Sequence, residues 1–327
     1  MYENKMTLDD LRRLQGLPLG NKILITQTRI MEWYMRNDGK VYVSFSGGKD
    51  STVLLDIVRK IYPDVPAVFV DTGLEYPEIR EFVKTMPNVI WLHPIKYDKH
   101  KMQYVRTNFR EVIQTYGYPL ISKDVSNCIY YAKKGSRSRL LRLYGESKQK
   151  DGNLSLYNCK KWKFMLDSPF DVSDKCCDIM KKKPVQMYNK DTGRKPMIAL
   201  LACESLKRRN DWLKTGCNAF DKKNPQSQPM AFWTEQDVLQ YLKEYNVPYA
   251  SVYGDIIEDE NGRLKTAGCH RTGCIFCGFG CHLEKEPNRF QMLKITHPNL
   301  WEYCMKPWDE GGLGMKEPLE FIGVKTE

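Results

Sequence analysis

The chain has 327 residues, which is enough for one large domain or two ordinary ones with a core that needs no disulfide staples. No apolar run approaches the ~20 residues that cross a bilayer, and the first residues lack the pattern of a signal peptide, so we expect a cytoplasmic protein with no membrane partner. The net charge of +11 suits anionic partners in general and does not select nucleic acid among them. In a reducing compartment, 11 cysteines indicate metal or redox chemistry rather than a disulfide framework.

Helices and strands alternate through the first third of the chain. Two helices are predicted before a C-cap at Asp38-Gly39. After residue 40, continuous apolar runs typical of buried strands alternate with segments whose apolar residues have the spacing of one helix face. We expect a strand from Val41, a helix through Val53–Ile61, a strand at 66–70, a helix at 76–87 and a strand at 88–95. This order predicts an α/β fold, a doubly wound parallel sheet that binds ligands beyond the carboxyl ends of its strands.

The first strand and its helix are joined by a glycine-containing loop, SGGKDS, which consists of Ser46, Gly47, Gly48, Lys49, Asp50 and Ser51. The two glycines allow a tight turn that brings backbone N–H groups close to an anion, and Lys49 adds a positive charge. Asp50 or Ser51 can cap the helix, whose N-terminus suits phosphate. A Walker A loop is excluded, because Asp50 stands where that motif needs Ser or Thr. Lys49 and Asp50 are the candidate catalytic residues, with Asp50 either a magnesium ligand or a helix cap.

The loop sequence resembles the pyrophosphate loop (PP-loop) of the ATP-pyrophosphatase, or adenine nucleotide alpha-hydrolase, superfamily, which cradles ATP or an adenylyl-sulfate compound. A second stretch, DTGLEYPE, resembles a segment of the phosphoadenosine phosphosulfate (PAPS) reductase family that helps to hold adenosine. The resemblance implies a Rossmann-like fold of that type, with nucleotide contacts from Asp71, Thr72, Gly73 and Glu75. A third stretch, LACESLKRR, resembles another family signature and implies contacts from Ser205 and Arg208, although Leu201 replaces an arginine expected there.

Two groups of cysteines lie far apart in the sequence. Cys176 and Cys177 are adjacent, and a later stretch has a C-x4-C-x2-C-x3-C pattern formed by Cys269, Cys274, Cys277 and Cys281. Thiolates separated by two residues can bind one metal centre, so we expect a C-terminal cysteine-rich metal-binding region that holds zinc or an iron–sulfur cluster. Resemblance to the cluster-bearing adenylyl-sulfate reductases implies a 4Fe-4S cluster on Cys176, Cys177, Cys274 and Cys277. The alternative set is the four later cysteines, Cys269, Cys274, Cys277 and Cys281, which resembles the arrangement of DNA phosphorothioation enzymes.

The segment 128–163 is predicted to be a basic helical insertion. The segment contains ten lysines and arginines but two acidic residues, and tyrosines and a tryptophan lie between the basic residues in the sequence. Cations neutralise phosphates and aromatic rings stack on exposed bases, so this is the candidate surface for tRNA or DNA. The alternative is a solvated insertion whose aromatic side chains point inward.

Three functions are consistent with these features. The PP-loop resemblance implies adenylation of tRNA or DNA by ATP and magnesium, followed by sulfur transfer from a sulfur donor. The PAPS reductase resemblance implies release of sulfite from PAPS or adenylyl sulfate, with electrons from a thioredoxin-like partner. Those reductases use a cysteine in a C-terminal tail, and no cysteine follows Cys304 here, so sulfur transfer is the preferred prediction and Cys281 the remaining thiol to test. The third function is a nucleotide- or redox-sensing module.

The resemblance covers about residues 38–285, with gaps in the basic insertion. We expect five parts along the chain. They are N-terminal helices at 1–38, the first part of the nucleotide-binding core at 39–127, the basic insertion at 128–165, the rest of the core with the adjacent cysteines at 166–255, and the cysteine-rich region and tail at 256–327.

Overall fold

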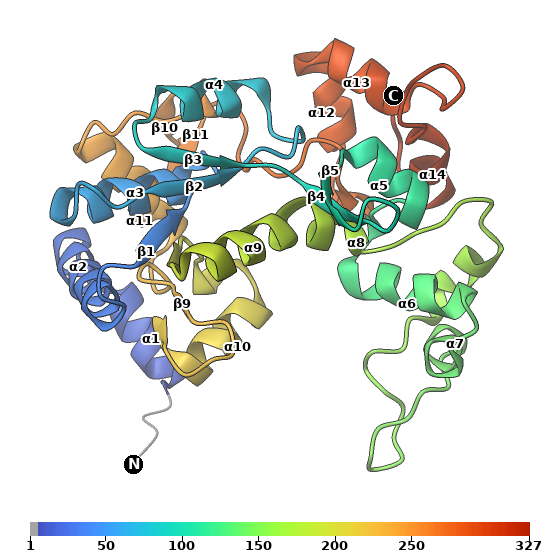
Figure 1. The fold of residues 1–327 in the computed structure, drawn as a ribbon, viewed down its shortest axis with the longest axis horizontal. Coiled ribbons are helices and arrows are strands. Elements are labelled where there is room, and N and C mark those ends of the chain that lie inside the picture. The colour runs from blue at the N-terminus through green and yellow to red at the C-terminus, as the bar shows by residue number, and fades with distance from the viewer. Residues whose placement is uncertain (1–5) are drawn as a thin grey trace. The chain divides into compact units, whose positions relative to one another are not determined.

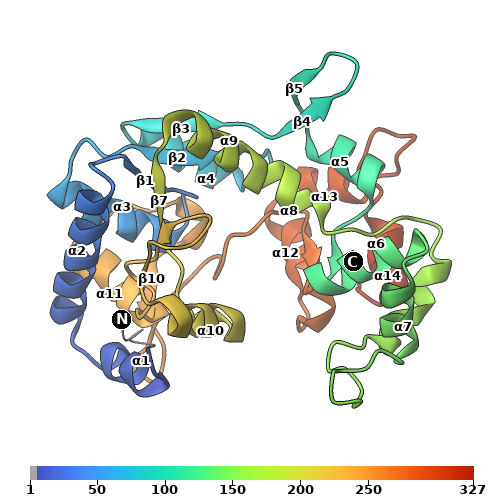
Figure 2. The ribbon, with the colours of Figure 1, turned by 60° about the horizontal axis from the view of Figure 1, so that its bottom comes forward.

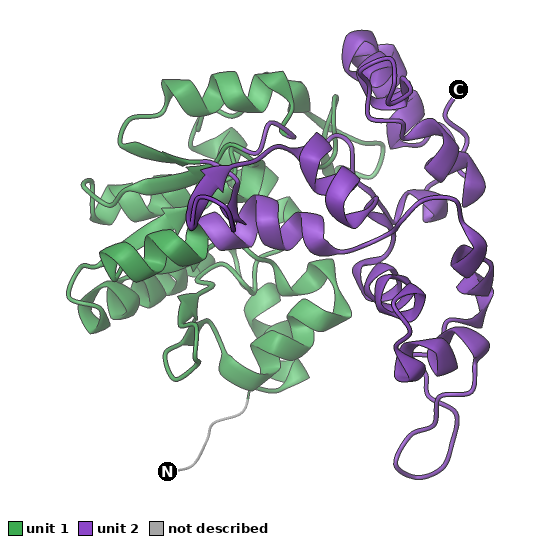
Figure 3. Cartoon of the chain, turned by 45° about the vertical axis from the view of Figure 1, so that its right-hand side comes forward, with its two compact units in different colours: residues 1–71, 75–92, 185–272 green, residues 72–74, 93–184, 273–327 purple. Residues whose placement is uncertain are grey.

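The structure, a computed structural model, describes residues 6–327, so the first five residues of the expected N-terminal part lie outside it. The chain forms two compact units, each built from separate stretches (Figure 3). Unit 1 contains residues 1–71, 75–92 and 185–272, and unit 2 contains residues 72–74, 93–184 and 273–327. The expected parts 39–127 and 166–255 therefore each contribute residues to both units.

Unit 1 is organised around a six-stranded sheet with the strand order β3-β2-β1-β7-β9-β8. The neighbouring pairs from β3 to β9 are parallel, whereas β8 runs antiparallel to β9. Helices lie on both sides of these strands (Figures 1 and 3), which confirms the doubly wound α/β fold predicted from the sequence. The strands are β1 (Val41–Ser44), β2 (Ala67–Val70), β3 (Val89–Leu92), β7 (Lys195–Ile198), β8 (Asn218–Ala219) and β9 (Gln226–Ser227), with a separate hairpin of β10 (Ile256–Glu258) and β11 (Leu264–Thr266).

The helices of unit 1 match the predicted helices closely where the apolar spacing is clear. In α3 the predicted face, which includes Val53, Ile57 and Val58, is buried. The core of the unit also contains three fully buried tryptophans, Trp33, Trp212 and Trp233. The helices are α1 (Leu8–Gln15), α2 (Leu19–Arg36), α3 (Lys49–Ile61), α4 (Pro77–Thr85), α10 (Leu206–Thr215) and α11 (Glu235–Glu244), with short 3-10 turns η3 (Ala202–Glu204) and η4 (Ser251–Tyr253).

A buried ion pair ties α2 to the start of α11. Lys22 Nζ lies 2.7 Å from both carboxylate oxygens of Asp237, and the lysine side chain is only 2% exposed. Asp237 also accepts a hydrogen bond from the backbone N–H of Thr234, the N-cap of α11. The pair thus fixes the beginning of α11, which carries Glu235.

Unit 2 is mainly helical, with two small two-stranded sheets. Strands β4 (Ile95–Asp98) and β5 (Gln103–Arg106) form a hairpin, visible in Figure 2. Strand β6 (Leu120–Ile121) pairs in parallel with β12 (Gly278–Phe279), which joins the middle of the chain to the late cysteine stretch. Its helices and turns are α5 (Phe109–Tyr116), α6 (Lys123–Lys133), α7 (Arg137–Tyr144), η1 (Lys160–Asp167), α8 (Lys175–Cys177), η2 (Asp178–Lys182), η5 (Cys281–Leu283), α12 (Arg289–Thr296), α13 (Pro298–Met305) and α14 (Lys316–Phe321). In sequence, α9 (Lys183–Thr192) runs across the division between the units.

None of the helices formed by residues 6–327 is both long enough and apolar enough to cross a membrane.

Candidate nucleotide site and cysteine group

The loop 46–51 follows β1 and lies where the strand order of the sheet reverses, between β2 on one side of β1 and β7 on the other. In doubly wound sheets this is the position at which ligands bind. Gly47 has a left-handed backbone with φ of 71°, and a Cβ atom there would lie 2.8 Å from Ile79 Cγ2 and 2.9 Å from Val83 Cγ2. Glycine is therefore required at this position for both conformation and space.

The two serines of the loop hold its backbone in place. The hydroxyl of Ser51 accepts a hydrogen bond from the N–H of Ser46 (3.2 Å) and donates one to the carbonyl of Gly48 (2.9 Å). Gly48 is the N-cap of α3, which begins at Lys49 and has no side-chain cap. The expectation that Asp50 or Ser51 caps the helix is wrong, because both residues lie inside its first turn.

Lys49 is almost completely buried, with 5% of its surface exposed. Its ammonium group lies 3.1 Å from Glu235 Oε1, donates to the carbonyl of His270 at 3.0 Å, and stands 5.2 Å from the centre of the Tyr253 ring. These contacts fix the charge at the N-terminus of α3. A bound phosphate would therefore meet a positioned cation rather than a mobile one.

Asp50 is surrounded by charged groups of the same unit. Burial raises the pKa of its carboxyl group, while the positive charges of Lys49 and Arg271 lower that pKa in part. Arg208 also acts on Asp50, and it forms an ion pair with Glu204. Three cations and several carboxylates thus face one another at the end of β1, an arrangement that can bind polyphosphate together with a divalent cation.

The second predicted stretch is divided between the units. Asp71 and Glu75 belong to unit 1, whereas Thr72 and Gly73 belong to unit 2. One carboxylate oxygen of Asp71, Oδ2, accepts a hydrogen bond from Arg80 at 2.8 Å. The other, Oδ1, is buried and has no hydrogen-bond partner within residues 6–327. A buried acceptor of this kind is costly unless a ligand donor such as a hydroxyl group satisfies it.

Ser205 and Arg208 lie at the start of α10. The Ser205 hydroxyl accepts a hydrogen bond from the N–H of Arg208 at 3.2 Å and so serves as the N-cap of the helix. Arg208 is the member of this pair that lies in the electrostatic environment of Asp50.

Several residues of this charged cluster were not predicted. Glu235 and Arg271 are separated from the loop by long stretches of sequence, and no motif singled them out. Cys203 was also missed, although it directly precedes Glu204 in the third signature. Among residues 6–327 it is the one exposed cysteine residue, although its sulfur atom is partly buried. Burial of its thiol and the charges of Asp50 and Glu235 raise the pKa of Cys203, while Arg271 lowers it, so the thiol lies beside the same cluster.

The cysteines predicted as cluster ligands, Cys176, Cys177, Cys274 and Cys277, all belong to unit 2. Burial raises the pKa of Cys176, and the neighbouring thiols of Cys274, Cys177 and Cys277 raise it further. Burial likewise raises the pKa of Cys277 to about 11, with contributions from Cys274 and Cys177. Cys176 and Cys277 are therefore each within electrostatic reach of the other cysteines of this set. Cysteine thiolates are the usual ligands of an iron–sulfur cluster.

The alternative ligand set is distributed differently. Cys281 is buried, and its thiol donates to the carbonyl of Gly278 at 2.9 Å, with Cys277 among its charged neighbours. Cys269 belongs to unit 1, where its thiol donates to the carbonyl of Arg271 at 3.0 Å. Across residues 6–327, no three His, Cys, Asp or Glu side chains are grouped closely enough to hold a single metal ion.

Some aromatic side chains of the basic segment are buried, and others are exposed. Trp162 is 8% exposed and therefore packed inward, whereas Tyr144 and Tyr157 are 40% and 72% exposed. Lysines lie against exposed rings, with Lys163 Nζ 4.5 Å from the centre of the Tyr144 ring. The segment thus has a buried tryptophan, Trp162, and an exposed surface of cations and aromatic rings.

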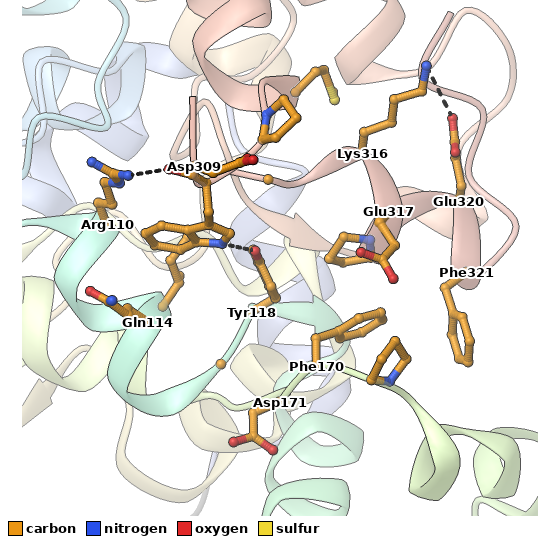
Figure 4. A pocket seen from close by; sticks show the side chains of 18 residues that line it. Arg110, Gln114, Tyr118, Phe170, Asp171, Asp309, Lys316, Glu317, Glu320 and Phe321 are labelled. Carbon is orange, nitrogen blue, oxygen red and sulfur yellow. Dashed lines mark hydrogen bonds and ion pairs between the residues drawn. The ribbon is translucent and has the colours of Figure 1, made fainter. Parts of the chain in front are cut away.

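Unit 2 also contains a cavity of about 1140 Å³, shown in Figure 4, between α5, residues 169–171 and the C-terminal residues 305–321. The indole of Trp308 donates to Tyr118 Oη at 2.6 Å, and Arg110 donates to the carbonyl of Trp308 at 2.8 Å. None of its lining residues was a predicted site residue.

The fold and the loop define a class, an α/β protein with a nucleotide-binding PP-loop. A family model described as the phosphoadenosine phosphosulfate reductase domain matches residues 40–146 and 137–278. The chain therefore belongs to the PAPS reductase domain family, within the PP-loop superfamily.

Curated relatives agree with this assignment. An adenosine 5'-phosphosulfate reductase of Staphylococcus haemolyticus is 24% identical over 233 residues, which cover 68% of this chain and 70% of the relative. An uncharacterised protein of Methanocaldococcus jannaschii is 25% identical over 274 residues, or 84% of this chain. The chain spans only 42% and 29% of the lengths of two M. jannaschii relatives. Among solved structures, a phosphoadenylyl-sulfate reductase from Candida auris matches with a TM-score of 0.39 and 15% identity, over 79% of this chain and 98% of the other.

Proposed function

We propose that this chain binds an adenine nucleotide at the loop 46–51 and uses it for sulfur chemistry, namely adenylation of tRNA or DNA followed by thiolation. The observation that carries the proposal is the cluster at the end of β1, where Lys49, Arg208 and Arg271 face Asp50. Lys49 is buried, whereas the side chains of Arg208 and Arg271 are partly exposed. Cations placed in this way neutralise the charge that develops on a departing pyrophosphate. Family membership supports nucleotide-dependent sulfur chemistry in general.

In the proposed reaction, an oxygen atom of the nucleic acid attacks the α-phosphorus of ATP. The bond from that phosphorus to the bridging oxygen breaks, and pyrophosphate leaves with its charge neutralised by Lys49 and the loop N–H groups. Asp50 is the proposed magnesium ligand, since carboxylate oxygens are preferred by that ion. A sulfur nucleophile at the oxidation level of sulfide, supplied by a donor, then attacks the activated atom of the substrate. The bond from that atom to the adenylylated oxygen breaks, and AMP leaves with that oxygen. The unsatisfied Oδ1 of Asp71 would accept a hydrogen bond from a ribose hydroxyl.

The cysteine group of unit 2 is the proposed site of a 4Fe-4S cluster held by Cys176, Cys177, Cys274 and Cys277. Neighbouring thiols raise the pKa of Cys176 and of Cys277, and a bound cation would stabilise the corresponding thiolates. When bound, such a cluster supplies one-electron chemistry.

The exposed cations and rings of the segment 128–163 support a nucleic acid as the substrate. Tyr144 and Tyr157 offer faces for base stacking, and Lys163 lies beside the first of them.

The test is pyrophosphate release from ATP and magnesium by the purified chain, with and without tRNA or DNA. We expect release that nucleic acid stimulates and that Lys49→Ala abolishes. Lys60→Ala is the matched control, because Lys60 lies on the same helix, is half exposed, and contacts Asp56 of α3 and Tyr241 of α11. Wild-type protein that releases no pyrophosphate with any nucleic acid would contradict the proposal, as would full activity of Lys49→Ala.

A second candidate, reduction of adenylyl sulfate or PAPS, is favoured by Cys203, an exposed residue whose thiol lies beside the same charged cluster. The Cys203 thiolate would attack the sulfuryl sulfur, the bond from that sulfur to the phosphate oxygen would break, and AMP or its 3'-phosphate would leave. A thioredoxin-like dithiol would then attack Cys203 Sγ, release sulfite and end as a disulfide, with the Cys203 thiol restored.

This candidate predicts sulfite release that Cys203→Ala abolishes. Cys217→Ala is the control, since Cys217 is buried in the same unit and its charged neighbours are Arg29 and Glu32 rather than Asp50. Sulfite release that survives Cys203→Ala would remove Cys203 from the reaction, and absence of sulfite from both substrates would remove the candidate.

A further inference from the structure

Two cysteines outside both sites, Cys128 and Cys159, lie in direct contact. The thiol of Cys159 donates a hydrogen bond to the sulfur of Cys128, with 3.8 Å between the two Sγ atoms. Cys128 is on α6 and fully buried, whereas Cys159 immediately precedes η1 and keeps 8% of its surface exposed. Both belong to unit 2, and neither is among the residues proposed as metal ligands.

The two sulfurs differ in their electrostatic environment. The hydrogen bond from Cys159 lowers the pKa of Cys128 to about 7, and the guanidinium groups of Arg142 and Arg139 lower it as well. The same contact raises the pKa of Cys159. At neutral pH the pair therefore combines a partly ionised sulfur with a protonated one, and the thiolate is the nucleophilic form of cysteine.

The backbone around the pair is held by several contacts to α7. The N–H of Cys159 donates to the carbonyl of Arg142 at 2.9 Å, and the thiol of Cys128 donates to the carbonyl of Arg139 at 3.4 Å. The guanidinium group of Arg142 donates to the carbonyl of Tyr157 at 2.9 Å and pairs with Asp124 at the start of α6. The two cysteines are thus held as neighbours by the fold, and a bond of about 2.05 Å requires the sulfurs to approach by less than ~2 Å through side-chain rotation.

We propose that Cys128 and Cys159 form a redox-active dithiol site that a hydroperoxide oxidises to a disulfide, joining the two ends of the segment 128–159. The Cys128 thiolate attacks one peroxide oxygen, the O–O bond breaks, and an alcohol or water leaves, so that Cys128 becomes a sulfenic acid. The sulfur of Cys159 then attacks Cys128 Sγ, the S–O bond breaks, and water leaves. Two thiols lose two electrons and two protons, and the peroxide is reduced to an alcohol, or water, plus water.

The segment closed by this bond contains α7 and the exposed residues Leu156 and Tyr157. Oxidation would fix both ends of this segment covalently, and a thiol reductant would release them. The inference does not depend on the proposed function, because it concerns sulfurs that take no part in nucleotide binding.

The test is disulfide mapping of the full chain. Reduced protein is treated with a small molar excess of hydrogen peroxide and then unfolded in the presence of N-ethylmaleimide, so that buried free thiols are also blocked. Peptides are analysed by mass spectrometry without reduction. We expect a linked pair of peptides containing Cys128 and Cys159, lighter than the two thiol peptides by two hydrogen atoms and lost on reduction. Cys304 serves as the internal control: it is as buried as Cys128 but, among residues 6–327, has no cysteine hydrogen-bonded to it, so it should remain a free thiol.

The outcome is read in two variants as well. Cys159→Ser should abolish the link, whereas Cys304→Ser should retain it. Alkylation of both Cys128 and Cys159 as free thiols after peroxide treatment would overturn the proposal, as would a link from either residue to a different cysteine. If a variant fails to fold, the mapping of the wild-type chain still shows whether the Cys128–Cys159 disulfide forms.

Discussion

Replacing Gly48 by alanine tests whether the backbone of the loop contacts phosphate. Gly48 has an extended conformation (φ −77°, ψ 159°) that alanine adopts without strain. The added Cβ would lie 3.2 Å from Ser46 Oγ and 3.3 Å from Tyr253 Oη, in close contact with both oxygens at the N-terminus of α3. We therefore expect a change in stability below about 1 kcal/mol, as for other N-cap exchanges of this size.

The effect on nucleotide binding should be larger. A methyl group at this position moves a phosphate away from the loop N–H groups, and a hydrogen bond to a charged group contributes about 1.5–3 kcal/mol. Loss of one such bond weakens affinity roughly 10- to 150-fold. The assay is calorimetric titration with ATP and magnesium, or with adenylyl sulfate, alongside thermal unfolding.

Gly47→Ala provides the contrast. Alanine in the left-handed conformation costs about 1–2 kcal/mol, and its Cβ would also press on the methyl groups of Ile79 and Val83. This variant should therefore lose both stability and affinity, whereas Gly48→Ala should lose affinity alone. A folded Gly48→Ala protein that binds both nucleotides as tightly as the wild type would refute the idea that the loop N–H groups hold phosphate.

Three further predictions follow from other parts of the chain. Lys22→Met leaves Asp237 buried without its partner, so urea unfolding should show a loss of about 3–5 kcal/mol, and a loss below about 1 kcal/mol would contradict a buried ion pair. Burial raises the pKa of Asp50, so folding favours its protonated form, and the stability linked to that proton is lost as pH rises. Asp50→Asn should therefore raise the melting temperature at neutral pH but not at a pH below 3.8, the ordinary carboxyl pKa. An equal shift of the melting temperature at both pH values would argue against burial as the cause. After anaerobic reconstitution with iron and sulfide, Cys277→Ala should lose most of its iron while Cys304→Ala keeps it, and full iron content in Cys277→Ala would exclude Cys277 as a ligand.

The sheet and the loop could be predicted because their signals are local. The apolar runs and helix-face spacing around residues 41–61 specify a strand, a turn and a helix within a few residues of one another, and the structure has them as β1 and α3. The sequence predicts a tight turn from two glycines, and Gly47, with a φ of 71°, has the left-handed conformation that such a turn needs, whereas Gly48 is extended. The helix cap was assigned wrongly, because a glycine with an extended backbone can serve as N-cap without any side-chain hydrogen bond.

The charged surroundings of the loop could not be predicted in the same way. Glu235 and Arg271 come to Lys49 and Asp50 through tertiary packing, and neither belongs to a pattern with a fixed spacing from the loop. The division into two units was also outside the reach of local patterns, since each unit combines segments that are far apart in the sequence. Cys203 stood within a recognised signature, but only its exposure and charged neighbours distinguish it from the other cysteines.

The most direct test of the account is hydrogen–deuterium exchange of the wild-type chain with and without saturating adenine nucleotide. We predict slower exchange of the backbone N–H groups in the loop 46–51, because the phosphates would accept hydrogen bonds from them. A nucleotide that binds tightly and protects other segments while exchange in this loop stays unchanged would contradict it.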